Sequence, residues 1–278
     1  MQIDGKIGFV GGGQMAEALI RGMVAAGVAG AAQILAVDPA QERRQLLADQ
    51  YGIEVAAEGG GLADCRVVVL AVKPQVMGKV IAQNLQFING GQLVVSIAAG
   101  ISLAFLEEAL AGRDCRVVRV MPNTPALVLE GASALCGGTG VAAGDLETAR
   151  LIFDAVGISV VLSEGEMDAV TGLSGSGPAY VFSFIEALVD SGVKVGLARG
   201  VAEKLALQTV LGSVKLAQTT GAHPAALRAM VTSPGGTTIA GLYELERAGF
   251  QGIIMDAVTA ATERSRELGR QATVKKPA

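Results

Sequence analysis

The first residues whose types and spacing suit chemistry are the glycines of the segment Gly-Gly-Gly-Gln-Met-Ala, residues 11–16. An apolar run at 7–10, typical of a strand, precedes them, and apolar residues at helical spacing follow. Gly11 would allow a tight turn, Gly13 would let backbone N–H groups approach a pyrophosphate, and Ala16 would let the helix pack against the strand. The pattern predicts a dinucleotide site. The alternative is an ordinary glycine-rich turn between a strand and a helix.

A second group of residues with chemical potential is the loop at 232–238, Thr-Ser-Pro-Gly-Gly-Thr-Thr. Four hydroxyls and two glycines precede a segment with helical spacing, and a helix N-terminus attracts anions. The loop therefore predicts a pocket for a small carboxylate, whereas a plain helix cap would need only one hydroxyl. The loop at 174–178, which contains Ser176, could line the same pocket.

Small residues and prolines follow three apolar strands, and ligands of open α/β sheets lie beyond the carboxyl ends of the strands. These segments are Ala-Val-Lys-Pro at 71–74, Ala-Ala-Gly at 98–100 and Met-Pro-Asn-Thr-Pro at 121–125. Lys73 could meet a phosphate or ribose, or it could be a solvated lysine. Asn123 could hydrogen-bond a nicotinamide or a substrate, or it could form an Asx-turn.

Asp38 ends the second predicted strand, where an acidic side chain usually accepts hydrogen bonds from the adenosine ribose and favours NAD over NADP. Arg43 and Arg44 follow and could meet a 2′-phosphate. The alternative for both arginines is a solvated helix face.

Elements that could position these residues follow from hydrophobic periodicity. We expect strands at 7–10, 33–37, 67–72, 93–97, 116–120, 132–136 and 158–162, with helices at 41–51, 75–84, 103–110 and 145–156. The alternation predicts an α/β fold with a doubly wound, mostly parallel sheet over residues 1–163. Helices are expected at 171–193, 199–218, 224–230, 237–247 and 252–268, which makes residues 164–278 a second, all-helical domain. The first of these helices is apolar nearly all round, so we expect it to be buried on all sides and predict a dimer.

Composition narrows the function classes. The chain has 278 residues, of which 51% are hydrophobic and 17% charged, and its net charge is −4. The lack of basic runs argues against nucleic acid as a partner, and the lack of a long uncharged apolar run argues against a membrane span. A strand starting almost at the first residue leaves no room for a signal peptide. Three scattered cysteines indicate reduced thiols of a cytoplasmic protein. One histidine and no Cys-x-x-Cys pattern make a metal site unexpected.

Over nearly its whole length the chain resembles the pyrroline-5-carboxylate reductase family. The shared motifs are Gly-x-Gly-Gln-Met-Ala at 11–16, Ala-Val-Lys-Pro at 71–74, Met-Pro-Asn-Thr-Pro at 121–125, Ser-Gly-Ser-Gly-Pro-Ala-Tyr at 174–180, His-Pro at 223–224 and Ser-Pro-Gly-Gly-Thr-Thr at 233–238. The resemblance implies an N-terminal Rossmann-type domain and a C-terminal helical dimerisation domain. Homodimers are implied, assembled in some members into decamers of five dimers.

The same resemblance implies a reaction, the last step of proline biosynthesis. A hydride passes from NAD(P)H, usually NADPH, to the C=N carbon of 1-pyrroline-5-carboxylate and gives L-proline. Substrate would be bound by Ser233, Gly235, Gly236, Thr237, Thr238, Ser176 and Asn123, with the Thr238 hydroxyl at the ring nitrogen as the catalytic group. Cofactor would be bound by Gly11, Gly13, Gln14, Met15, Ala16, Asp38, Ala71, Val72, Lys73, Pro74, Ala98, Met121, Pro122 and Asn123.

Two departures from the family pattern leave the choice between NADP and NAD open. Glu58 stands where members commonly have Asn, and Asp38-Pro39 stands where many have Ser or Asn with Arg. The reaction itself is unaffected, because a protonated cyclic imine accepts hydride without a strong acid, and its site needs positioning and hydrogen bonds.

Two other functions are open on the residues alone. A 3-hydroxyacid dehydrogenase of similar architecture would carry a catalytic Lys and a nearby Asn on the helix after Gly177, where this chain reads Pro-Ala-Tyr-Val-Phe-Ser-Phe-Ile. A non-catalytic NAD(P)-sensing regulator would not need the hydroxyl-rich loop at 232–238.

Overall fold

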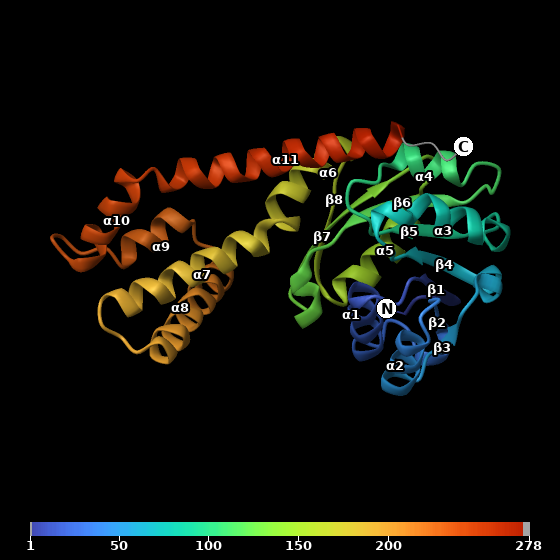
Figure 1. Cartoon of the computed structure of the whole chain (residues 1–278), viewed down its shortest axis with the longest axis horizontal. Helices are drawn as coiled ribbons and strands as arrows, with labels where there is room; N and C mark the ends of the chain where they lie inside the picture. The colour runs from blue at the N-terminus through green and yellow to red at the C-terminus, as the bar shows by residue number, and fades with distance from the viewer. Residues whose placement is uncertain (1, 275–278) are drawn as a thin grey trace. The chain divides into compact units, whose positions relative to one another are not determined.

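The computed structural model describes residues 2–274, with side chains through residue 270 (Figure 1). The chain forms two compact units. Unit 1 consists of two segments, one that ends at Ser176 and one that begins at Thr259. Unit 2 is the segment between them, Gly177–Val258. The expected boundary at residue 164 lies where the sequence pattern changes from alternating strands and helices to helices alone. It differs from this division and stays a prediction.

Unit 1 is built on an eight-stranded sheet. Its strands are β1 (Lys6–Val10), β2 (Ile34–Val37), β3 (Glu54–Ala56), β4 (Cys65–Leu70), β5 (Leu93–Ser96), β6 (Arg116–Met121), β7 (Gly131–Gly137) and β8 (Gly157–Val161). Their order is β3-β2-β1-β4-β5-β6-β7-β8, and every neighbouring pair is parallel except β6 with β7. The doubly wound, mostly parallel sheet is therefore confirmed. The pattern missed β3, and it placed the end of β4 at residue 72 where the strand ends at Leu70.

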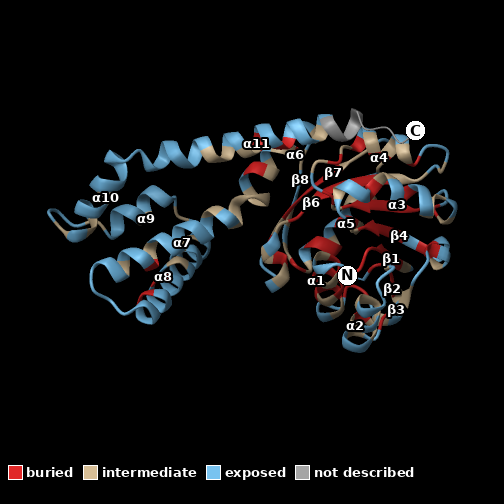
Figure 2. Ribbon diagram, in the orientation of Figure 1, coloured by how far each residue is buried: buried red, intermediate tan, exposed pale blue. Residues whose placement is uncertain are grey.

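Helices cover both faces of this sheet, so its central strands are buried on both sides (Figure 2). One apolar core contains residues of α1 (Gln14–Ala25), α2 (Gln41–Tyr51) and α5 (Ala143–Asp154). The other contains residues of α3 (Met77–Asn84), α4 (Leu103–Ala109) and α6 (Met167–Val170). Strands such as β4 consist almost wholly of apolar residues because neither of their faces meets water.

Unit 2 is helical. It contains α7 (Gly177–Lys194), α8 (Arg199–Thr220), α9 (Pro224–Met230), α10 (Thr237–Arg247) and the first part of α11 (Phe250–Val274). The expected helix at 171–193 is interrupted, since a π-helix at Thr171–Gly175 separates α6 from α7. Among the described residues, no helix is long and apolar enough to cross a membrane.

In the single chain α7 is not buried on all sides, so the expected burial depends on the predicted dimer. Its side chains are largely exposed, with Phe182 at 65%, and Val189 is its one buried residue. The core of unit 2 is small, consisting of Val189, Ala202 and Ala206 with two partly buried neighbours. Because α8 packs against α7 through so few residues, most of the apolar surface of α7 stays exposed. Such a surface marks a site of association with another chain.

Candidate functional site

The glycine loop between β1 and α1 has the backbone that a dinucleotide site requires. Gly11 adopts φ +100°, and a Cβ there would lie 2.7 Å from the Ala71 carbonyl oxygen, so only glycine fits. Gly13 is the N-cap of α1, and a Cβ on it would meet no atom within 4 Å. Ala16 is fully buried. The tight turn and the open approach predicted for the loop are thus present.

Asp38 holds this loop rather than standing free at the end of β2. Its Oδ2 accepts a hydrogen bond from the Gly12 N–H at 2.7 Å, and its Oδ1 accepts one from the Ala40 N–H at 2.8 Å. These two bonds fix the backbone of the loop on one side chain. Its contact with a ribose stays a prediction.

Arg43 and Arg44 are also engaged within the chain, so the alternative of a simply solvated face does not describe them. Arg43 donates from Nε to the Gly12 carbonyl oxygen and from Nη2 to Glu17, both at 2.7 Å. Arg44 donates from Nη1 to the carbonyl oxygens of Asp38 and Pro39, each at 2.8 Å. Gly12 is therefore held through its N–H by Asp38 and through its carbonyl oxygen by Arg43.

The other predicted cofactor residues come to the same edge of the sheet. β1, β2, β4, β5 and β6 run parallel, so the segments after their carboxyl ends share one edge. The Ala71 N–H donates to the Val10 carbonyl oxygen at 2.8 Å, which fixes the start of the 71–74 segment beside the glycine loop. Lys73 is exposed and Ala98 is buried. This edge therefore gathers the loops that the sequence singled out in unit 1.

Asn123 has structural partners that the sequence did not reveal. Its Oδ1 accepts from the Ala132 N–H at 2.8 Å, and its Nδ2 donates to the Ser174 carbonyl oxygen at 3.1 Å. Both partners are distant in the sequence, so the alternative of a local Asx-turn is wrong. Contact between Asn123 and a ligand stays a prediction.

The π-helix next to Asn123 ends at Gly175, and the predicted substrate residue Ser176 is its C-cap. The Ser176 N–H donates to the Thr171 carbonyl oxygen at 2.8 Å, which is the five-residue spacing of a π-helix. A Cβ on Gly175 would lie 2.5 Å from the Met121 Cε, so the end of β6 packs directly against this wide turn. π-Helical turns are rare and often occur at functional sites.

The hydroxyl-rich loop of unit 2 forms the N-terminus of α10. Gly235 adopts φ +65°, and the Gly236 N–H donates to the Ser233 carbonyl oxygen at 3.1 Å. Of the four hydroxyls, that of Thr232 donates to the Arg228 carbonyl oxygen at 2.7 Å. The other three, of Ser233, Thr237 and Thr238, make no hydrogen bond to another described residue. They are free for a ligand at a helix end that attracts anions.

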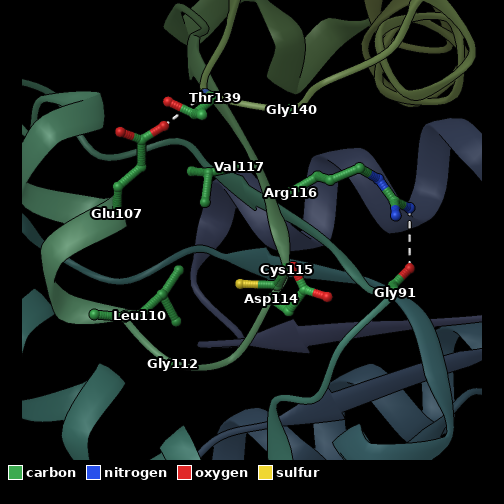
Figure 3. A pocket seen from close by; sticks show the side chains of 11 residues that line it. Gly91, Glu107, Leu110, Gly112, Asp114, Cys115, Arg116, Val117, Thr139 and Gly140 are labelled. Atoms are coloured by element: carbon green, nitrogen blue, oxygen red, sulfur yellow. Dashed lines mark hydrogen bonds between the residues drawn. The ribbon is translucent and has the colours of Figure 1, made fainter.

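A cavity of about 570 Å³ in unit 1 lies away from these residues (Figure 3). Its lining includes Gly91, Cys115 and Arg116 at the amino ends of β5 and β6, on the edge opposite the glycine loop. Figure 3 shows Arg116 donating to the Gly91 carbonyl oxygen and Glu107 accepting from the Thr139 N–H. Burial raises the pKa of the Cys115 thiol. None of the predicted site residues lines this cavity.

Comparison with known proteins gives consistent matches along the chain. The family described as pyrroline-5-carboxylate reductase dimerisation matches residues 164–268, and the family described as NADP oxidoreductase coenzyme F420-dependent matches residues 6–100. Pyrroline-5-carboxylate reductase of Arabidopsis thaliana is 46% identical, over 95% of this chain and 96% of its own. That of Methanosarcina acetivorans is 46% identical, over 96% and 98%.

Solved structures give the same result. Pyrroline carboxylate reductase of Plasmodium falciparum, with NADP bound, has a TM-score of 0.85 at 36% identity and covers 97% of this chain and 100% of its own. Pyrroline-5-carboxylate reductase of Coxiella burnetii has a TM-score of 0.91 at 34% identity, over 96% and 99%.

Proposed function

Because the chain belongs to the pyrroline-5-carboxylate reductase family, we propose that it reduces 1-pyrroline-5-carboxylate to L-proline with NADPH through the residues described above. NADPH supplies the hydride, and NADH is also usable. The observation that carries the proposal is the set of three unengaged hydroxyls at the N-terminus of α10, within the segment that matches the family.

The substrate carboxylate is held by the N-terminal end of α10. Ser233 and Thr237 are exposed and offer hydroxyl donors, while Gly235 and Gly236 keep the backbone open to a small anion. A helix N-terminus adds unpaired N–H groups and a favourable dipole. These groups bind a carboxylate without any cationic side chain.

Thr238 is the residue at the reacting bond. Its half-buried hydroxyl in the first turn of α10 hydrogen-bonds the ring nitrogen as that atom changes from iminium to amine. The hydride goes to the C=N carbon, the electron pair of the double bond goes to nitrogen, and the nitrogen keeps its proton. The hydroxyl can accept from the nitrogen's N–H and donate to the lone pair that forms on nitrogen, and a hydrogen bond gained in this way lowers the barrier rather than only tightening binding.

The cofactor is held by the carboxyl edge of the sheet. The glycine loop and the N-terminus of α1 receive its pyrophosphate, and the segments after β4, β5 and β6 line its nicotinamide half. The choice between NADPH and NADH depends on Asp38, whose carboxylate stands where a ribose is expected.

We propose that the chain forms a homodimer and that five of these dimers assemble into a decamer. The match to the dimerisation family and the exposed apolar side chains of unit 2 support the dimer. A cytoplasmic location is supported by three free thiols.

The test is a direct assay. Purified protein is mixed with NADPH and 1-pyrroline-5-carboxylate, and the loss of nicotinamide absorbance is followed together with the appearance of proline. Turnover of 3-hydroxyacids with NAD instead would favour the dehydrogenase alternative. Cofactor binding without turnover of either substrate would favour a regulator.

A further inference from the structure

A second cavity of unit 1, of about 370 Å³, is lined by three arginines from separate elements. Arg119 comes from β6, and Arg266 and Arg270 come from α11. Glu164 and Asp168, near and within α6, also line it. None of these residues belongs to the predicted substrate or cofactor site.

Arg119 is a buried cation with unused donors. Only 6% of its side chain is exposed, and its Nη1 donates to Glu164 Oε1 at 2.7 Å. Its Nε and Nη2 make no hydrogen bond to another described residue. A guanidinium has five N–H donors, so those on Nε and Nη2 are available to an acceptor in the cavity.

The two arginines of α11 are one helical turn apart and therefore point to the same side. Neither forms an ion pair with another residue of the described part of the chain. Arg264, on the same helix, differs in this respect, because it pairs with Glu267 at 2.7 Å and does not line the cavity.

The two carboxylates at the cavity are each engaged through one oxygen, and Glu164 Oε2 is buried without a hydrogen-bond partner among the described residues. Glu164 Oε1 accepts from Arg119 and from the Leu103 N–H at 3.1 Å, and Asp168 Oδ1 accepts from the Ser265 hydroxyl at 2.6 Å. Cys136, beside Glu164, stays a neutral thiol, because burial and Glu164 raise its pKa to about 11. Three guanidiniums against two carboxylates leave the cavity positive.

We propose that this cavity binds a small oxyanion of the phosphate class, held between Arg119 and the two arginines of α11. Guanidinium groups match the geometry of phosphate oxygens and form charge-assisted, often bidentate, hydrogen bonds with them. The bound anion would join the C-terminal turns of α11 to β6 and to the start of α6, and so stabilise unit 1.

The experiment is a calorimetric titration of the full-length protein with inorganic phosphate at constant ionic strength, chloride being exchanged for phosphate. Saturating NADPH is present, so that phosphate cannot occupy the dinucleotide loop. The test variant is R266Q/R270Q, which changes exposed side chains and leaves the Arg119–Glu164 ion pair intact. The matched control is R264Q, with the same change of charge outside the cavity.

We expect one phosphate per chain in the wild type and in R264Q, and at least a tenfold loss of phosphate affinity in R266Q/R270Q. Phosphate should also raise the Tm of the wild type and not that of the double variant. The proposal is overturned if the wild type shows no binding up to about 20 mM phosphate. Equal affinity in all three proteins, or an equal loss in R264Q, would overturn it as well.

Discussion

Asn123 donates a hydrogen bond from its side-chain amide to the backbone carbonyl of Ser174, at 3.1 Å. The same amide accepts from the Ala132 N–H, so it joins the end of β6, the start of β7 and the π-helix. Ser176 lies two residues beyond Ser174. The position of a predicted substrate residue therefore depends on a side chain from the cofactor edge of the sheet.

Asn123→Asp removes the donor to Ser174 and keeps an acceptor for Ala132. Because two oxygens would then face each other, we expect the turn before Ser176 to shift and the KM for pyrroline-5-carboxylate to rise roughly 5- to 20-fold. The KM for NADPH should rise less, because the glycine loop and the N-terminus of α1, which receive the pyrophosphate, are unchanged. Steady-state kinetics with each substrate varied in turn would measure both.

A matched control is Asn89→Asp. Asn89 also donates from its side-chain amide to a distant carbonyl, that of Ala63 at 3.0 Å, but it precedes β5 at the opposite edge of the sheet. Its kinetics should stay those of the parent. If the two variants behave alike, the link from Asn123 to Ser176 has no role in substrate binding.

Thr238→Ala should lower kcat/KM by roughly 10- to 150-fold, because a hydrogen bond to a charged group contributes about 1.5–3 kcal/mol. NADPH binding should be unchanged, since the glycine loop belongs to the other compact unit. Thr238→Ser retains the hydroxyl and should keep most of the activity. Parent-like turnover by Thr238→Ala would show that the hydroxyl is not needed, and that an ordered water or the substrate's own protonation serves instead.

Asp38→Ser tests cofactor choice. Removing the carboxylate removes its repulsion of a 2′-phosphate, so we expect the NADPH:NADH ratio of kcat/KM to rise roughly 5- to 30-fold, equivalent to about 1–2 kcal/mol. Both cofactors should also bind somewhat less well, because the acceptor for the Gly12 N–H is altered. An unchanged ratio would place Asp38 away from the ribose and leave it only the role of holding the loop.

The sequence was a reliable guide where local patterns decide the structure. The helices α2, α9 and α10 have the predicted ends, because Gly52, Pro224 and Gly236 give local stop or start signals. The strands β1, β5 and β6 were found within a residue at each end, since buried parallel strands read as apolar runs. The three-residue strand β3 has too few residues to show a period.

The sequence could not show interactions that form only in the folded chain. Asn123 meets Ala132 and Ser174 through tertiary packing, and nothing in its own motif identifies those partners. The cavity beside Arg119 is missed for the same reason, because its lining comes from β6, α6 and α11. The apolar character of α7 was read correctly and predicted a dimer, but the pattern cannot say which residues of a second chain would cover it.

The exposed apolar surface of α7 predicts that dimerisation depends on it. Phe182 is 65% exposed in the single chain, and buried aromatic side chains often dominate interfaces. Phe182→Asp should weaken the dimer at least roughly 30-fold, or about 2 kcal/mol. Analytical ultracentrifugation should show no folded monomer of the parent at micromolar concentration. A parent that sediments as a stable monomer, or a variant that dimerises equally well, would contradict this.

The buried cysteines predict that the free energy of unfolding depends on pH. Burial raises the pKa of Cys65 and that of Cys136 to about 11, with Glu164 adding to the effect at Cys136. Because the folded state holds these protons more tightly than the unfolded state, the stabilisation is complete below the unfolded pKa of about 9 and is lost as the pH rises toward 11. Denaturant melts at pH 8 and pH 10.5 should show the decrease, and native thiols should react slowly with a disulfide reagent at pH 8. Fast native labelling of both thiols would contradict the assignment.

The division of the chain has a consequence for its synthesis. Unit 1 is discontinuous, since α11 returns to it from Thr259 onward and Ser265 bonds Asp168. A nascent chain that has just completed the sheet at β8 still lacks part of the unit to which that sheet belongs. Domains generally fold as units during translation, so this one has to wait until the helical segment 177–258 has also left the ribosome. Emergence of the segment that begins at Thr259 is therefore a condition for completing unit 1.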